Sequence, residues 1–97
     1  MTRTSPVRKV QCTRTFDSDY KRLPDEIRNE VDQALRDLVK DPMPRRLRFE
    51  KLAGHRRSPI FTIHATRNHS YKISFKLCGN TAVLRRVARH KTIDRGP

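Results

Sequence analysis

Three consecutive runs in the second half of the chain alternate apolar and polar side chains with a period of two. Residues 61–66 place Phe, Ile and Ala between Thr and His, and residues 70–77 place Tyr, Ile, Phe and Leu between Ser and Lys. A third β-rich run, residues 81–87, follows the turn pair Gly79-Asn80. Alternation of this period, interrupted by turn residues, predicts a β-meander with one buried face.

The register of the first hairpin follows from the pleat. Pairing Ala65 with Tyr71 also aligns Ile63 with Ile73, leaves a loop of residues 67–69, and puts the apolar side chains of both runs on one face. Four polar side chains then share the opposite face, which we expect to be open to solvent and free of acidic residues: Thr62, His64, Lys72 and Lys76. A one-residue slip would bury the lysines, so this register is well specified.

The second hairpin has two possible registers. A two-residue turn aligns Leu84 with Phe75, whereas a one-residue bulge aligns Val87 with Ile73. The sequence leaves both open. The two-residue turn directs Arg85 to the polar face, whereas the bulge directs Arg86 there.

The first half of the chain predicts a strand and two helices. Residues 8–14 alternate as a strand, a short helix begins at Thr15, and a longer helix runs from Pro24 to Lys40. Apolar side chains recur along both helices at helical spacing and form one face: Phe16, Tyr20, Leu23, Ile27, Val31, Ala34, Leu35 and Leu38. Residues 42–59 are interrupted by prolines and rich in Arg, which predicts an irregular basic segment on the surface.

These elements predict one small α+β domain over residues 1–97, in which a helical hairpin packs on one face of an antiparallel sheet. Residues 1–7 read as a flexible basic arm. Cys12 and Cys78 are isolated, which argues against a zinc site and favours buried, reduced thiols. The chain has no apolar run long enough to span a membrane, and we expect a cytoplasmic protein.

Charge points to the kind of partner. The 97 residues carry a formal net charge of +13. Residues 15–41 hold eight of the ten acidic residues, whereas residues 42–97 contain only Glu50 and Asp94 against fourteen Lys and Arg. A segregated basic surface predicts a polyanionic partner, usually nucleic acid. Composition by itself supports binding and does not establish cleavage.

The polar face of the meander offers the chemistry of RNA cleavage. Attack of a 2′-hydroxyl on the adjacent phosphate needs a proton acceptor, a proton donor and cations on the phosphate. Histidine suits the proton transfers, Lys or Arg suits the phosphate, and the reaction requires no metal or cofactor. The simpler interpretations are that His64 is a surface residue, that His90 only ends a strand, and that His55 and His69 are solvated loop residues.

Three stretches of the chain resemble the RelE/ParE superfamily of type II toxin–antitoxin toxins. They cover about residues 8–95 in the family's order: FDSDYKRLPDEIRNEVDQALRDLVKDP, LRFEKLAGH and IFTIHATRNHSYKISFKLCGNTAVLRRVARH. The resemblance implies a β-α-α-β-β-β domain, with a further C-terminal helix in some members. It also implies a cognate antitoxin as partner. RelE-like members cut mRNA in the ribosomal A site without metal.

The resemblance also implies site residues. Tyr71-Lys72 matches the family's Tyr-Arg pair, His64 stands where a Lys is frequent, and His90 stands at the C-terminal catalytic position. We therefore expect His90 as general acid or base with His64 assisting, and Lys72 and Arg67 on the phosphate. The remaining cations of this surface are expected to bind RNA: Arg85, Arg86, Arg89, Lys76, Lys51 and Arg56.

Two departures from the family pattern bear on the mechanism. Lys72 replaces a bidentate Arg with a point charge, and Ile93-Asp94 occupies the region where a Tyr is frequent. Two other functions therefore stay open on the same fold. One is a ParE-like toxin that inhibits DNA gyrase and cleaves nothing, and the other is a catalytically degraded homologue that only binds RNA or the ribosome.

The charge pattern predicts that the antitoxin docks an acidic segment on the basic surface. Its affinity should fall steadily as salt rises, because the screening length shortens from about 10 Å at 0.1 M to about 3 Å at 1 M. Fluorescence titration of the labelled antitoxin at several NaCl concentrations measures this dependence. An affinity independent of salt would contradict the prediction.

Overall fold

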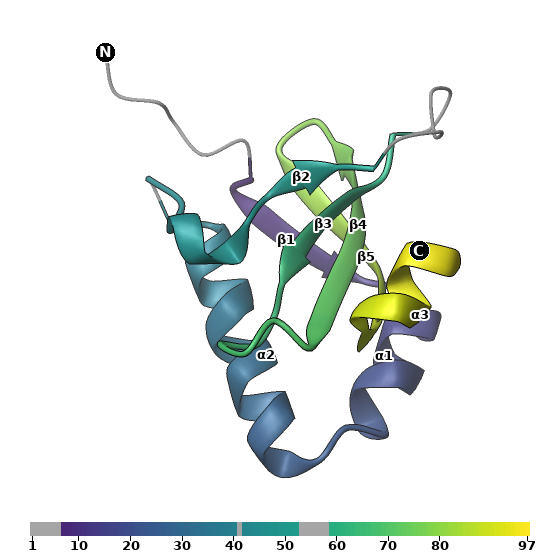
Figure 1. The fold of residues 1–97 in the computed structure, drawn as a ribbon. Coiled ribbons are helices and arrows are strands. Elements are labelled where there is room, and N and C mark those ends of the chain that lie inside the picture. Colours follow the sequence, from purple (N-terminus) through teal and green to yellow (C-terminus); the bar gives the residue numbers. More distant parts are fainter. Residues whose placement is uncertain (1–6, 41, 53–58) are drawn as a thin grey trace.

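A five-stranded sheet forms the centre of the molecule in the computed structural model, which describes residues 7–40, 42–52 and 59–97 (Figure 1). The strands follow the order β1-β5-β4-β3-β2. Their bounds are β1 Lys9–Cys12, β2 Glu50–Lys51, β3 Phe61–His64, β4 Tyr71–Cys78 and β5 Thr81–Arg89. The helices are α1 Arg14–Lys21, α2 Asp25–Leu38 and α3 His90–Arg95, and a 3-10 turn, η1, spans Arg45–Leu47. The α+β class is therefore as expected.

Three features of the fold differ from the expectation. The sheet is mixed, because β1 pairs in parallel with β5 while the other neighbouring strands are antiparallel. The segment expected to be irregular contributes η1 and a fifth strand, β2, which pairs with β3. The chain also continues past β5 into α3, a C-terminal helix that the resemblance implied for some members of the family only. Each difference depends on pairing or docking against a distant segment, which local patterning does not encode.

The first hairpin has the predicted register. Ile63 pairs with Ile73 and His64 with Lys72, and the amide of Ala65 donates to the carbonyl of Tyr71 over 2.9 Å. In its loop, His69 has a φ of 61°. The residue that adopts the left-handed conformation in this tight hairpin loop is therefore a histidine.

The second hairpin combines the two registers that the sequence left open. Phe75 pairs with Leu84 near the turn, and Ile73 pairs with Val87 farther along, with an irregularity between Ser74 and Phe75. Residue 85 is the additional residue of this bulge. Both alignments therefore hold, each on its own side of the bulge.

The start of α1 lies one residue earlier than expected. Thr13 caps the helix by accepting a hydrogen bond from the amide of Phe16 (3.2 Å), and its hydroxyl donates to the carbonyl of Leu84 (2.8 Å). The cap therefore also ties the helix to β5. Pro24 precedes α2 as its N-cap, and Asp25 and Glu26 lie in the first turn.

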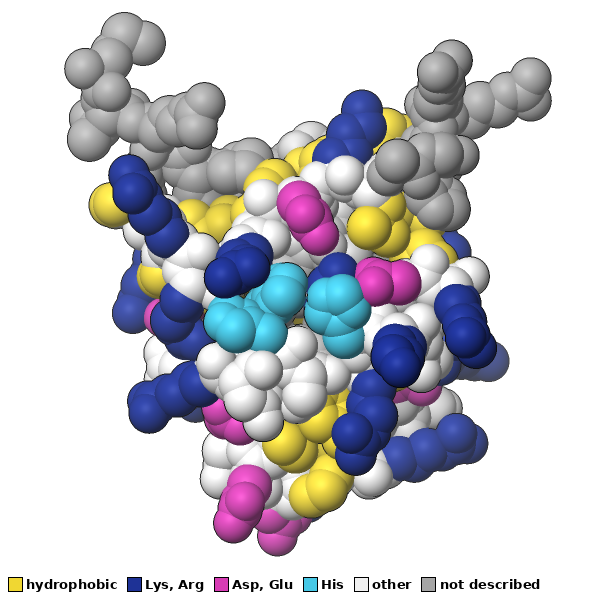
Figure 2. Space-filling view, in the orientation of Figure 1, with side chains coloured by type: hydrophobic (Ala, Val, Ile, Leu, Met, Phe, Trp, Pro, Cys, Tyr) yellow, Lys and Arg dark blue, Asp and Glu magenta, His cyan; other side chains and the backbone are white. Residues whose placement is uncertain are grey.

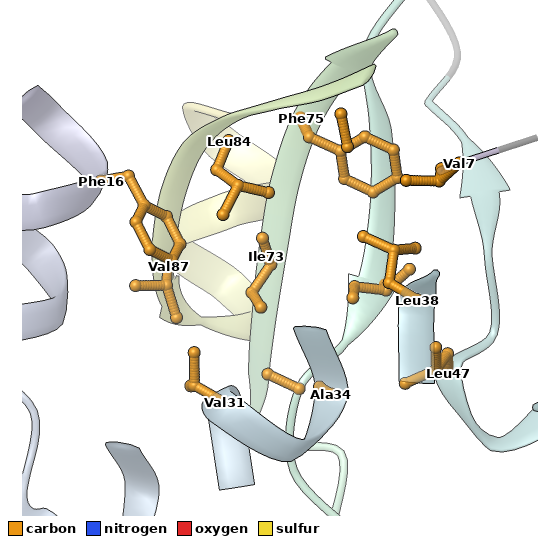
Figure 3. Close-up of a cluster of buried hydrophobic side chains, with 13 residues drawn as sticks. Val7, Phe16, Val31, Ala34, Leu38, Leu47, Ile73, Phe75, Leu84 and Val87 are labelled. Atoms are coloured by element: carbon orange, nitrogen blue, oxygen red, sulfur yellow. The ribbon is translucent and has the colours of Figure 1, made fainter. Parts of the chain in front are cut away.

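The hydrophobic core lies between the sheet and the helical hairpin. Figure 3 shows Phe16 of α1 beside Val87, and α2 with Val31 and Ala34 below the strands that carry Val87 and Ile73. The rings of Phe49, Phe61 and Phe75 continue the core, with centroids 5.4–6.0 Å apart. The predicted apolar stripe therefore does cover one face of the sheet.

The opposite face of the sheet is not open, which contradicts the sequence expectation. Along β4, Lys72, Ile73, Ser74 and Phe75 are all buried, so the strand is covered on both sides. α3 packs against β4 and β5, and its Ile93 is fully buried. Docking of this short helix closes the polar face at one end.

Two further observations concern the chain as a whole. Cys12 and Cys78 are exposed rather than buried, so that expectation is wrong. Both lie at strand ends, where the side chains escape the core. Within the described ranges, no helix combines the length and the apolar character needed to cross a bilayer.

Phe75 should be a main determinant of stability. Its side chain is fully buried among aromatic rings, and Phe75→Ala should lower the free energy of unfolding by about 3–5 kcal/mol. Urea denaturation followed by circular dichroism measures the loss. Phe61→Ala, at the half-buried partner position in β3, is the matched control and should cost less. Equal losses would contradict the assignment of Phe75 to the centre of the core.

Candidate functional site

Three histidines from separate segments form one cluster on the surface (Figure 2). His64 ends β3, His69 lies in the following loop, and His90 is the first residue of α3. The amide of His90 donates to the carbonyl of Ser70 over 2.9 Å, which fixes the start of α3 beside the loop. His69, expected to be a solvated loop residue, is therefore part of the cluster.

His64 is the centre of this cluster. Its Nδ1 lies 2.8 Å from Nδ1 of His69, and its ring centroid lies 5.5 Å from that of His90. A hydrogen bond between two Nδ1 atoms holds one proton, so the pair cannot keep this bond with both rings protonated. His69 has a positive φ, and its ring lies edge-on to that of His64 with the centroids 4.7 Å apart.

The environment of His64 opposes its protonation. Only 7% of the residue is exposed. Burial lowers the pKa of His64, and the charges of His69, Lys72, His90 and Arg48 lower it further. The interpretation of His64 as a plain surface residue is therefore wrong.

Lys72 lies beside His64 in the sheet and is 3% exposed. Its Nζ is 2.9 Å from Oδ1 of Asp94 and 3.5 Å from Oε1 of Glu50. A buried ammonium group is tolerated when it is paired and hydrogen-bonded. The polar face is therefore not free of acid: the two acidic residues of the C-terminal half both lie on it.

Asp94 connects Lys72 to His90. Its Oδ2 lies 2.8 Å from Nδ1 of His90, one helical turn earlier in α3. Burial is the largest influence and raises the pKa of Asp94, but the hydrogen bond and charge of Lys72 and the proximity of His90 outweigh it, so the pKa lies below its ordinary value. Because a carboxylate accepts the Nδ1 proton, the Nε2 atom of His90 is left available for proton transfer.

The cations expected on the phosphate and on RNA do not all reach this cluster. Arg67 is exposed and lines a pocket with residues of α2 such as Asn29 and Gln33, and its amide donates to Glu30 Oε1 over 3.0 Å. The structure therefore places Arg67 on the helical side of the loop rather than beside His64.

The remaining cations expected to bind RNA have different surroundings. Arg86 is paired with Asp19 of α1 (3.1 Å), and Arg85 donates to the carbonyl of Pro97 (3.2 Å). Arg89 lies over the ring of Tyr71, 5.5 Å from its centroid. The other described cations are Lys51, which is exposed in β2, and Lys76, which is half-buried in β4. Arg56 and His55 lie outside the described residues.

A basic pocket of about 410 Å³ lies along the outer side of α3. It is lined by Arg86, Lys91, Thr92, Arg95 and Gly96. Arg86 is neutralised by Asp19, whereas Lys91 and Arg95 have no acidic partner among the residues described here. The pocket is thus a cationic surface next to His90.

Sequence reasoning missed four residues of the site: Arg48, Glu50, His69 and Asp94. Asp94 had a usable signal, because a helix beginning at His90 would bring residues 90 and 94 onto one face. The sequence signal for His69 was weaker: the predicted loop of three residues holds His69 close to the end of β3. Arg48 and Glu50 come from a segment that the pattern left irregular.

The cluster combines groups for proton transfer with a cation. Two imidazoles face each other edge-on, one oriented by a carboxylate, next to a buried ammonium group. Such an arrangement suits general acid–base chemistry on an anionic substrate. Within the described part of the chain, no group of three or more His, Cys, Asp or Glu side chains is arranged to hold a metal ion.

Comparison with solved structures identifies the fold. The chain is similar to the archaeal RelE–RelB complex of Pyrococcus horikoshii OT3, with 13% identity, a TM-score of 0.66 and coverage of 86% of this chain and 94% of that one. The toxin–antitoxin complex RelBE2 of Mycobacterium tuberculosis matches with 24% identity, a TM-score of 0.68 and coverage of 93% and 98%. YafQ from Escherichia coli strain BL21(DE3) matches with 16% identity, a TM-score of 0.66 and coverage of 89% and 97%.

No protein-family model and no curated protein matches the chain at a significant level. Each of these structural matches nevertheless covers most of this chain and nearly all of the matched chain. The chain therefore has the RelE-like fold that the sequence resemblance implied.

Stability should decrease as the pH falls below neutrality. The lowered pKa of His64 means that the unfolded chain takes up a proton near pH 6.5 while the folded chain still resists it. The stabilising contribution is therefore complete above about pH 6.5 and is lost as pH falls toward the folded-state pKa. Urea midpoints between pH 7.5 and pH 5 measure the slope. His64→Gln should flatten it, and an unchanged slope in that variant would contradict the assignment.

Proposed function

We propose that the protein is the toxin of a type II toxin–antitoxin system and that it cleaves mRNA in the ribosomal A site. The whole described domain has a RelE-like fold, and several of the matched structures are complexes of a toxin with its antitoxin. The strongly basic charge suits RNA as substrate. Translating ribosomes would present this substrate in the cytoplasm.

One observation carries the nuclease proposal. His64 and His90, 26 positions apart in the sequence, face each other edge-on at 5.5 Å between ring centroids. The buried Lys72 pairs with His64 in the sheet. Two imidazoles and a cation at one surface site supply an acceptor, a donor and a charge for the phosphate. A protein that only binds RNA has no need of this combination.

In the proposed reaction His90 is the general base. Its Nε2 takes the proton of the 2′-hydroxyl while the 2′-oxygen forms a bond to the adjacent phosphorus. The bond from phosphorus to the 5′-oxygen breaks, and the imidazolium form of His64 gives its proton to that leaving oxygen. Because its surroundings lower the pKa of His64, this imidazolium is the minor form at neutral pH, but it is a stronger acid than that of an ordinary histidine. The chemistry uses side chains alone and leaves a 2′,3′-cyclic phosphate and a 5′-hydroxyl.

Two cations are proposed to stabilise the charge that develops on the phosphate. Lys72 supplies a fixed ammonium group, although Glu50 and Asp94 share it. Arg48 lies close enough to His64 to influence its pKa and is exposed. Arg67 has no part in this reaction centre, because it lies beside α2.

The RNA strand is proposed to leave the reaction centre along α3 and β5. Arg89, Lys91 and Arg95 are exposed there and carry no acidic partner among the described residues. Lys51 of β2 is also exposed, but it pairs with Phe61 and therefore lies on the opposite face of the sheet from Glu50. Contacts of this kind bind the phosphate backbone without reading its sequence.

The antitoxin is proposed to cover the same cationic surface. RelB accompanies RelE in the Pyrococcus horikoshii structure, and DinJ accompanies YafQ in that of Escherichia coli. An acidic antitoxin segment would complement the charge of the C-terminal half of this chain and exclude RNA by occupying its site.

Primer extension on an mRNA translated in vitro tests the nuclease directly. The wild-type protein should cut at A-site codons, and His90→Ala and Lys72→Met should each reduce the rate about 100-fold or more. Met preserves most of the volume of the buried Lys72 side chain, so the variant tests the charge. Lys21→Ala, an exposed position at the end of α1, is the matched control and should cut normally.

Absence of cleavage by the wild-type protein would overturn the proposed activity. Inhibition of gyrase supercoiling by the same preparation would then identify the ParE-like alternative. Full activity in both site variants, with cleavage by the wild type, would show that the reaction centre lies elsewhere on the molecule.

A further inference from the structure

The carboxylate of Asp94 contacts two proposed catalytic groups at once. Its Oδ2 is 2.8 Å from Nδ1 of His90 and its Oδ1 is 2.9 Å from Nζ of Lys72. Both of its oxygens are therefore engaged by the site. A Tyr is frequent in this region of RelE-like toxins, so the resemblance does not assign a role to a carboxylate here.

We propose that Asp94 is a positioning residue that acts through His90. It holds His90 in the tautomer with the proton on Nδ1 and leaves Nε2 bare to accept the 2′-hydroxyl proton. Lys72 holds Asp94 in turn. This inference rests on the proposed nuclease function, because it assigns His90 as the base.

The tautomer follows from the hydrogen-bonding groups. An ionised carboxylate has only acceptor atoms, so the contact with Nδ1 of His90 requires a proton on that nitrogen. The lowered pKa of Asp94 keeps the carboxylate ionised at neutral pH. In a neutral imidazole the second nitrogen then carries no proton and is a base.

Backbone and side-chain contacts together fix the direction of the ring. The amide of His90 is anchored to the carbonyl of Ser70, and the spacing of four residues places Asp94 over the same helical face. Lys72 is nearly fully buried, so it provides a rigid attachment for the second oxygen of the carboxylate. Without Lys72 the Asp94 side chain, which is 42% exposed, could turn toward water.

The same contacts allow a competing interpretation. A carboxylate on Lys72 also occupies the place where a phosphate oxygen would bind, so Asp94 could obstruct the substrate. The two roles predict opposite results. Loss of a positioning residue lowers the rate, whereas loss of an obstructing anion raises the affinity for RNA and the rate.

Asp94→Asn is the informative variant, because it keeps the size of the side chain and removes its charge. An Asn can donate to Nδ1 of His90 and so favour the opposite tautomer. The single-turnover rate of cleavage should fall about 10- to 10⁴-fold, the range seen when a histidine loses its orienting carboxylate, with KM changed much less. Asp94→Glu should recover part of the rate. Asp17→Asn, on the exposed surface of α1, is the matched control and should cut normally.

A double-mutant cycle shows whether Asp94 acts through His90. In the His90→Ala background, Asp94→Asn should cause no further loss, because the group that it positions is gone. The full additional loss in that background would overturn the proposal. A rise in rate or in RNA affinity with Asp94→Asn alone would also overturn it and would support the obstructing role.

The pH profile supplies a readout that a merely structural role would not move. The groups that face His90 are Asp94 on its own helix, His64 on β3 and Lys72 on β4. With His64 and Lys72 unchanged, Asp94→Asn should shift the limb of the rate profile that reports the titration of His90 toward lower pH, because the imidazolium loses its counter-charge. An unchanged profile would contradict the proposal.

The ¹⁵N chemical shifts of the His90 ring test the tautomer without any cleavage assay. They should report a proton on Nδ1 in the wild-type protein and a displaced equilibrium in Asp94→Asn. If the wild-type protein cuts no RNA, the proposed function fails and these shifts still decide the positioning role. Identical ring shifts in both proteins would overturn that role.

Discussion

The buried ammonium group of Lys72 is the constraint on which the arrangement of this site depends. It lies in β4, the middle strand of the sheet, and only 3% of the residue is exposed. A charge in that position must be paired, and Glu50 from β2 and Asp94 from α3 pair it. The edge strand β2 and the terminal helix are thereby tied to the middle of the sheet, and α3 brings His90 and Asp94 into contact with each other beside His64.

The consequence is that the proposed reaction centre lies at one end of the sheet rather than on an open sheet face. Thr62 and Ser74, farther along the same face, are fully buried, and their hydroxyls have no hydrogen-bond partner among the described residues. The accessible groups are those at the junction of the first hairpin loop and the start of α3, where His69 and His90 are partly exposed. In the proposed function, RNA would reach the histidines from this junction, and the buried Lys72 lies behind them.

The fold explains how the acidic and basic parts of the chain divide the surface between them. Acidic residues of the helical hairpin neutralise nearby cations: Asp19 pairs with Arg86, and the nearly buried Asp37 pairs with Lys40 and Arg46. Among the described residues, cations farther from the helical hairpin form no ion pairs with these acidic residues. The surface around the histidines is thus basic despite Glu50 and Asp94, because Lys and Arg outnumber the acidic residues in the C-terminal half and the acidic helices pair with other cations.

The alternation of side chains decided much of this structure in advance. It specified the pairing of β3 with β4, the apolar face that the helices cover, and the placement of His64 opposite Lys72, because a strand directs successive side chains to opposite faces whatever surrounds it. It also predicted the two alternative registers of the second hairpin. Both occur in the structure, one on each side of the bulge at residue 85.

What only the tertiary structure decided are the contacts between segments that no local period connects. The parallel pairing of β1 with β5, the docking of the six-residue α3 and the turn of His69 toward His64 all depend on distant partners. So does the position of Arg67, which follows α2 rather than the site. Three residues of the candidate site, His64, Lys72 and His90, were therefore visible in the sequence. The roles of Asp94, Glu50 and His69 were not, because a charge or a ring acquires its role from the groups that the fold brings against it.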